Sequence, residues 1–135
     1  MSEKKTVTGG CLCGGVRFTV TLPSIWCAHC HCTLCRRAHG AGYVTWVGVE
    51  ESRFHLDQGE DLLTWYGSSE AAKRGFCSRC GSSMFFRSSR WPGEIHVTLA
   101  NFDGPIDRQP EAHAFHDTHV NWMPLDDALT IYRVD

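Results

Sequence analysis

The sequence predicts a mainly β domain with short helical turns. Three observations support this fold class: short segments of alternating apolar and polar residues, an enrichment of β-branched and aromatic residues in those segments, and frequent glycine turns between them. No segment carries the apolar residue spacing of a long amphipathic helix. Many short strands without a long helical period are typical of a β-rich fold.

The first half of the chain contains two well-marked strands. Residues 1–8 are a polar lead-in, in which a first strand begins only near the end. Residues 16–21 alternate apolar and polar side chains, which predicts a half-buried strand. Residues 36–42 favour a short helical turn or a loop, and residues 43–49 predict a strand because they are rich in β-branched and aromatic residues.

The second half continues the pattern with shorter segments. Residues 53–56 and 62–66 are expected to be strands on either side of a turn at 57–60. Residues 84–87 are expected to form another strand. Pro92 and Gly93 predict a turn after it, and the alternation of apolar and polar residues at 94–99 predicts a further strand.

Length and composition limit the class of protein. A chain of 135 residues is expected to form one domain, residues 1–135, with a modest core. The net charge is −2, so the chain does not have the excess of basic residues that is typical of nucleic-acid-binding proteins, and we expect no nucleic-acid partner. The first residues contain no apolar leader and no later run is long enough to span a membrane, so we expect a soluble, cytoplasmic protein with no membrane partner.

Eight cysteines dominate the chemistry of the chain. Four of them, Cys27, Cys30, Cys32 and Cys35, lie within nine residues. Two pairs flank this stretch, one at Cys11 and Cys13 and the other at Cys77 and Cys80. Disulfides are rare in a reducing compartment, and thiols at such short spacing are typical of soft-metal coordination, above all of Zn(II).

The two flanking pairs predict a structural zinc site. Cys77 and Cys80 form a C-x-x-C knuckle, and Cys11 and Cys13 lie between glycines that allow the tight turn of a second knuckle. Together the two pairs supply four thiolates, the donor set of a closed structural site. Such a site would tie the start of the chain to its middle and stabilise a small core.

The central stretch allows two interpretations. Cys30, Cys32 and Cys35 supply three sulfurs, and a zinc ion with three protein ligands keeps one position for water or substrate, as catalytic zinc does. Cys27 is near enough in sequence to be the fourth ligand, which would close the site. The chain would then be a non-catalytic two-zinc module that binds a protein partner. Spacing alone leaves both interpretations open.

Three motifs resemble those of one known family. They are GGCLCGGVRF at 9–18, CHCTLCRR at 30–37 and FCSRCGS at 76–82. In this order they are similar to the glutathione-dependent formaldehyde-activating enzymes, the CENP-V/GFA domain family. A histidine and a tryptophan within 113–122 also fall where that family has them. The resemblance covers about residues 9–123 and implies a β-tent fold with two zinc sites.

The resemblance also implies roles for the cysteines and a reaction. Cys11, Cys13, Cys77 and Cys80 would hold the structural zinc, whereas Cys30, Cys32 and Cys35 would hold the catalytic zinc. The implied activity is that of a carbon–sulfur lyase acting on an adduct of an aldehyde with a small-molecule thiol such as glutathione, S-hydroxymethylglutathione being the name-giving case. Cys27 lies outside the family's pattern of seven cysteines.

Several other residues are weaker candidates. His39 follows the central stretch, and we consider it as a general base near the open zinc position. The late histidines recur every third residue, so a tri-histidine site would require a turn or 3₁₀ geometry; they are His113, His116 and His119. Four arginines could receive the carboxylates of a glutathione-like anion: Arg36, Arg37, Arg87 and Arg90.

Overall fold

The computed structural model describes residues 5–133, and the regular secondary structure in this part of the chain is mainly β-strand, as the sequence predicts. Its elements in chain order are β1 (Thr6–Gly10), β2 (Arg17–Thr21), β3 (Trp26–Cys30), α1 (Thr33–His39), β4 (Val44–Glu50), η1 (Glu51–Arg53), β5 (Phe54–Gln58), β6 (Leu63–Gly67), β7 (Ala72–Cys77), β8 (Ser83–Ser88), β9 (Glu94–Thr98), η2 (Leu99–Asn101), β10 (Ala112–Ala114), η3 (His116–Thr118) and β11 (Thr130–Tyr132).

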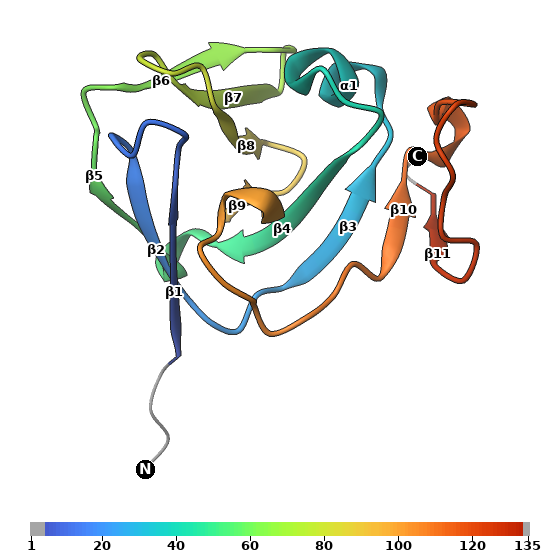
Figure 1. Ribbon diagram of the computed structural model, residues 1–135, viewed down its shortest axis with the longest axis horizontal. Helices are drawn as coiled ribbons and strands as arrows, with labels where there is room; N and C mark the ends of the chain where they lie inside the picture. Colours follow the sequence, from blue (N-terminus) through green and yellow to red (C-terminus); the bar gives the residue numbers. More distant parts are fainter. Residues whose placement is uncertain (1–4, 134–135) are drawn as a thin grey trace.

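The described strands form two sheets (Figure 1). The smaller sheet has the order β1-β2-β5 and is antiparallel. The larger sheet has eight strands in the order β11-β10-β3-β4-β9-β8-β7-β6. Its middle is antiparallel, whereas β10 runs parallel to both β3 and β11, which adds the late part of the chain to the edge beside β3.

Most strands lie where the sequence patterns predict them. The strand expected to begin near the end of residues 1–8 is β1, and the six other predicted strands overlap β2, β4, β5, β6, β8 and β9. The sequence patterns do not predict β3, because its residues belong to the cysteine-rich stretch, nor do they predict β7, β10 and β11. The helical turn expected at 36–42 is the helix α1, which begins earlier, at Thr33, because Cys32 caps it.

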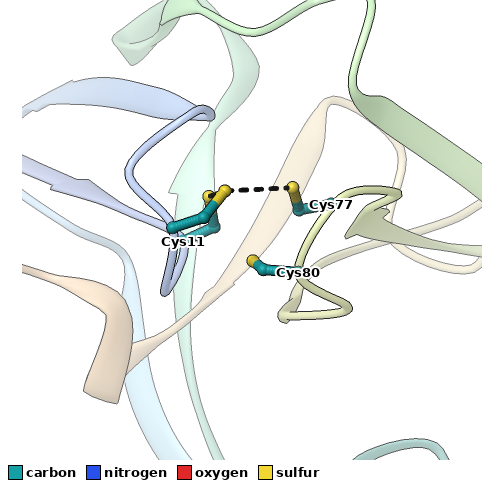
Figure 2. A group of neighbouring side chains, drawn as sticks. Cys11, Cys77 and Cys80 are labelled. Carbon is teal, nitrogen blue, oxygen red and sulfur yellow. Dashed lines mark hydrogen bonds between the residues drawn. The ribbon is translucent and has the colours of Figure 1, made fainter.

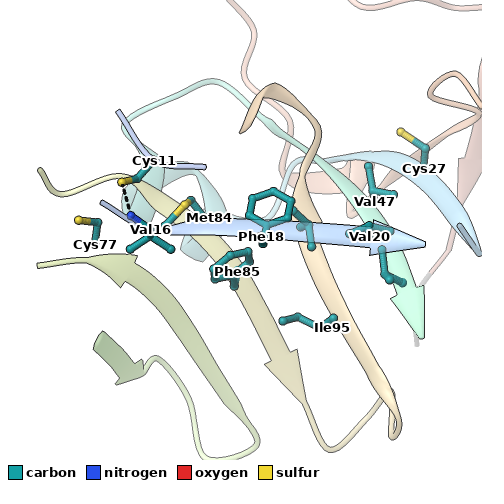
Figure 3. Close-up of a cluster of buried hydrophobic side chains, with 12 residues drawn as sticks. Cys11, Val16, Phe18, Val20, Cys27, Val47, Cys77, Met84, Phe85 and Ile95 are labelled. Carbon is teal, nitrogen blue, oxygen red and sulfur yellow. Dashed lines mark hydrogen bonds between the residues drawn. The ribbon is translucent and has the colours of Figure 1, made fainter. Parts of the chain in front are cut away.

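The main core fills the space between the two sheets (Figure 3). Phe18 of β2 is fully buried, and its ring lies 5.7 Å from that of Phe54, 5.4 Å from that of Phe85 and 5.4 Å from that of Phe102. Aromatic pairs at these separations add to the stability that burial of apolar area provides. This core fixes the small sheet against β4, β8 and β9.

The alternation of side chains along β4 and β3 produces a second, smaller cluster. Val47 and Val49 of β4 enter the main core, whereas Val44 and Trp46 point to the other face. On β3, Cys27 belongs to the main core and Cys30 to the second cluster. The second cluster therefore lies against the face of the large sheet that α1 partly covers. Among residues 5–133, no helix is long and apolar enough to cross a membrane.

Candidate metal sites and the adjoining cavity

The first cysteine group joins the turn after β1 to the turn between β7 and β8 (Figure 2). The sulfur atoms of Cys11, Cys13, Cys77 and Cys80 all lie within 4.8 Å of one another. The sulfurs of Cys11 and Cys13 are 3.5 Å apart, and those of Cys13 and Cys77 are 3.8 Å apart. Sulfurs at the corners of a tetrahedral zinc site are about 3.8 Å apart. The four residues fit such an ion.

Backbone and side-chain donors surround these sulfurs. Val16 N donates to Cys11 Sγ at 3.2 Å and Arg79 Nε donates to Cys13 Sγ at 3.2 Å. The backbone N–H of Gly15, followed by Arg79, lowers the pKa of Cys13. Hydrogen bonding to Ser82 lowers the pKa of Cys80 to about 5. Donors that favour thiolates prepare the group for a cation.

Each of the two turns contains a glycine with positive φ, as the glycines beside the cysteines predict for metal-binding knuckles. Gly14 has a φ of 78° and Gly81 has a φ of 79°. A side chain would strain the backbone at either position. The glycines thus allow Cys13 and Cys80 to turn back toward the sulfurs of Cys11 and Cys77.

The second cysteine group lies where β3 passes into α1. The sulfurs of Cys30, Cys32 and Cys35 lie within 4.8 Å of one another, and those of Cys30 and Cys35 are 3.5 Å apart. Cys32 is the N-cap of α1, and its sulfur accepts the backbone N–H of Cys35 at 3.2 Å. Hydrogen bonds from Cys30 and then Cys35 hold the pKa of Cys32 well below that of a free thiol. The sulfurs again form a donor set suited to zinc, now with three members.

Cys27 does not belong to this group. It precedes Cys30 by an odd number of strand residues, so its side chain points to the opposite face of β3, into the main core with Val20 and Val47 (Figure 3). Its side chain is completely buried, and burial raises the pKa of the thiol to about 11. In this structure Cys27 is a neutral core residue and leaves the three-cysteine group without a fourth sulfur.

Arg74 is a site residue that no sequence motif indicated. It lies on β7, is 8% exposed, and both terminal nitrogens lie 3.6 Å from Cys35 Sγ. Its guanidinium also stacks on Phe86, 5.0 Å from the ring centre. Among residues 5–133, no carboxylate lies within 4.0 Å of this cation. A buried charge needs a counter-charge, and a divalent ion held by three thiolates is net negative.

His39 lies at the end of α1 with its ring 5.3 Å from that of Trp46. Burial lowers its pKa to about 4, so the imidazole is neutral at neutral pH. A base of such low pKa removes protons weakly. Its part in catalysis remains a prediction.

The histidines form a separate cluster at the edge of the large sheet. His31 Nε2 and His113 Nδ1 are 2.9 Å apart, and His113 Nε2 is 3.0 Å from the carbonyl oxygen of Asp126. His116 begins the 3₁₀ turn η3, which brings its ring to 4.3 Å from that of His119. In the described part of the chain only the two cysteine groups have ligand atoms close enough together for a metal ion.

A cavity of about 540 Å³ opens beside the three-cysteine group. Cys30, Cys32, Cys35 and Arg74 contribute to its wall. Of the four arginines proposed to receive carboxylates, Arg90 also lines it. Arg36 instead donates to the carbonyl oxygen of Thr118, and Arg87 pairs with Glu51. Clefts and cavities of this size hold small-molecule ligands.

Comparisons with known proteins identify relatives along most of the chain. The family model for glutathione-dependent formaldehyde-activating enzymes matches residues 6–118. A Halomonas elongata protein, provisionally named a glutathione-dependent formaldehyde-activating enzyme, is 29% identical over 125 residues, which cover 87% of this chain and 80% of the relative. An uncharacterised lyase of Schizosaccharomyces pombe is 20% identical over 127 residues, covering 94% of this chain and 90% of its own.

One solved structure is similar to this chain in fold and in sequence. The crystal structure of a Rhodobacter sphaeroides protein superposes with a TM-score of 0.63 and 30% sequence identity. The match covers 75% of this chain and 92% of the other.

Proposed function

The chain belongs to the glutathione-dependent formaldehyde-activating enzyme family, and from this premise we propose that it is a zinc-dependent carbon–sulfur lyase acting on a glutathione-type thiol–aldehyde adduct. The observation that carries the proposal is the three-cysteine group, which lacks a fourth sulfur and borders a ligand-sized cavity. We assign one zinc ion to this group and a second, structural zinc to Cys11, Cys13, Cys77 and Cys80. We also place the protein in the cytoplasm, because a reducing compartment keeps cysteines unpaired and all eight cysteines here are free.

The reaction joins or separates a thiol and a carbonyl compound. In the cleavage direction the carbon–sulfur bond breaks, the sulfur leaves as a thiolate, and the adduct's hydroxyl loses its proton as the carbonyl forms. The thiolate takes up a proton on release, so a thiol and an aldehyde are the only products. Zinc bound by Cys30, Cys32 and Cys35 would supply a Lewis acid that favours the thiolate over the thiol.

The protein's own groups support the charge that develops. Arg74 places a buried cation against Cys35, where it offsets the negative charge of the three sulfurs and of an incoming thiolate. The apolar wall of the cavity keeps the site poor in water, which strengthens this attraction. The N-terminus of α1 adds a favourable dipole near Cys32.

Activity assays on the zinc-loaded protein test the proposal. We expect the wild-type protein to accelerate both formation and breakdown of hemithioacetals from glutathione and an aldehyde. We expect Arg74→Gln to lower kcat/KM by about 10- to 100-fold, the usual effect of losing a partner of a metal ligand. Zinc content and the circular dichroism spectrum should stay close to those of the wild type.

Arg87→Gln is the matched control, because Arg87 lies on the neighbouring strand β8 and pairs with Glu51, away from the cysteines. Its activity should equal that of the wild type. The proposal is wrong if the wild-type protein with two zinc ions bound accelerates the reaction no more than zinc-free buffer does.

A further inference from the structure

The cavity beside the three-cysteine group is much larger than a formaldehyde-derived group requires. A hydroxymethyl group has one carbon and one oxygen, roughly the volume of two water molecules at about 30 Å³ each. The cavity measures about 540 Å³. The hydroxymethyl group itself would therefore fill only a small part of this volume, and its surroundings would be a wall that is mainly apolar.

The wall is aromatic and continuous. Trp46 and Phe86 lie 5.9 Å apart between ring centres, and Phe86 and Trp91 lie 6.2 Å apart. Trp26 and Phe115 also line the cavity. These side chains come from β3, β4 and β8 and from the segments after β8 and β10, so the wall surrounds the space from several directions. Such a surface favours a flat apolar group.

Few charged groups inside the cavity are available to a peptide-like ligand. Arg74 already donates hydrogen bonds to Cys35 Sγ and stacks on the ring of Phe86. His96 Nε2 is hydrogen-bonded to the carboxylate of Glu94. Arg90 and Glu111 are exposed to solvent. Glutathione carries two carboxylates and an ammonium group, which are costly to bury without partners. These charges are best placed at the exposed margin, which leaves the aromatic interior to the other half of the adduct.

The strand β10 contributes to this space through small residues. Ala112 and Ala114 line the cavity, and because they are two residues apart they share one face of the strand. A larger side chain at either position would extend into the cavity. The size of the space thus depends on alanine at these positions.

We propose that the carbonyl-derived half of the substrate is an aromatic group of benzaldehyde size or larger, which occupies the cavity while the thiol sulfur faces Cys30, Cys32 and Cys35. This inference rests on the proposed function, of which it names the substrate class. It assigns the aromatic wall to substrate binding.

Binding of two inert thioethers tests the inference without requiring turnover. S-benzylglutathione and S-methylglutathione differ only in the group on sulfur and contain no hydroxyl to eliminate. We expect the zinc-loaded protein to bind the benzyl compound roughly 10- to 100-fold more tightly in calorimetric titrations, as expected from burial of one phenyl ring. Equal affinities for the two compounds would overturn the inference.

Three variants locate the preference in the cavity. Trp91→Ala removes part of the wall and Ala112→Leu fills part of the space, so each should reduce the benzyl-to-methyl ratio several-fold. Trp65→Ala is the control, because Trp65 is also half-buried but packs against Phe85 and Arg87 outside the cavity. A ratio that changes in the Trp65 variant and not in the other two would contradict the assignment.

Kinetics then separate this inference from the proposed function. We expect kcat/KM for the adduct of glutathione with benzaldehyde to exceed that for the formaldehyde adduct. Faster turnover of the formaldehyde adduct would overturn the substrate class while supporting a lyase. A retained benzyl preference with turnover of neither adduct would refute the lyase function and still support an aromatic ligand for the cavity.

Discussion

Replacement of Cys77 with alanine is expected to unfold much of the chain. Cys77 ends β7, is completely buried, and belongs both to the four-cysteine group and to the main core. Structural zinc contributes an apparent free energy of about 10–16 kcal/mol in small zinc domains. The net stability of a domain is only about 5–15 kcal/mol. If loss of one ligand abolishes zinc binding, the lost free energy can exceed the whole net free energy of unfolding.

The effect should be visible in circular dichroism and in the metal content of the purified protein. We expect Cys77→Ala to lose most of its β-sheet signal at 25 °C and to retain no zinc at the four-cysteine group. Cys27→Ala is the matched control, because Cys27 is equally buried in the same core and lies outside both groups. It should cost about 1 kcal/mol of unfolding free energy. Equal destabilisation by the two substitutions would contradict a structural role for the metal.

The second large effect is expected at Cys32, where substitution should remove the activity and leave the fold intact. Cys32 is half-buried at the start of α1, and the helix it caps covers only one part of the large sheet. Cys32→Ala removes one of three sulfurs and should lower kcat/KM by more than about 100-fold, the upper figure for residues that only support a ligand. The fold should persist, because the four-cysteine group and the main core are unchanged.

A serine variant separates the metal from the helix cap. Serine is a good N-cap residue, so Cys32→Ser should keep α1 while it removes the sulfur. We expect both variants to contain about one zinc ion per chain, the four-cysteine set alone still being complete, and to melt close to the wild type. Full activity in Cys32→Ser, or unfolding as severe as in Cys77→Ala, would refute the division between a structural and a catalytic site.

The sequence was most informative where local patterns decide the structure. Alternation predicted β2 and β9, and the paired knuckles predicted which four cysteines meet. Gly14 and Gly81 have the positive φ that such knuckles require. The strands and the glycine turns depend on neighbours within a few residues, so they can be inferred from one sequence. The two cysteine pairs are far apart in sequence, and their meeting was inferred from the four thiolates that a closed zinc site requires.

Features that depend on distant segments were not predicted. Arg74 lies far from Cys35 in sequence, and only the packing of β7 near α1 brings the two together. The cavity likewise needs walls from several strands. The position of Cys27 could have been predicted, because a strand over 26–30 places Cys27 and Cys30 on opposite faces. The cysteine spacing suggested a metal-binding loop there instead, and the strand was missed.

The central claim is that one zinc ion has a position that an incoming thiol can occupy. X-ray absorption at the zinc edge measures the sulfur ligands directly on the two-zinc protein. We predict an average of fewer than four sulfurs per zinc without thiol, and a rise to about four on addition of glutathione, the full number for tetrahedral zinc. Four sulfurs per zinc before any thiol is added, with no change afterwards, would contradict the claim.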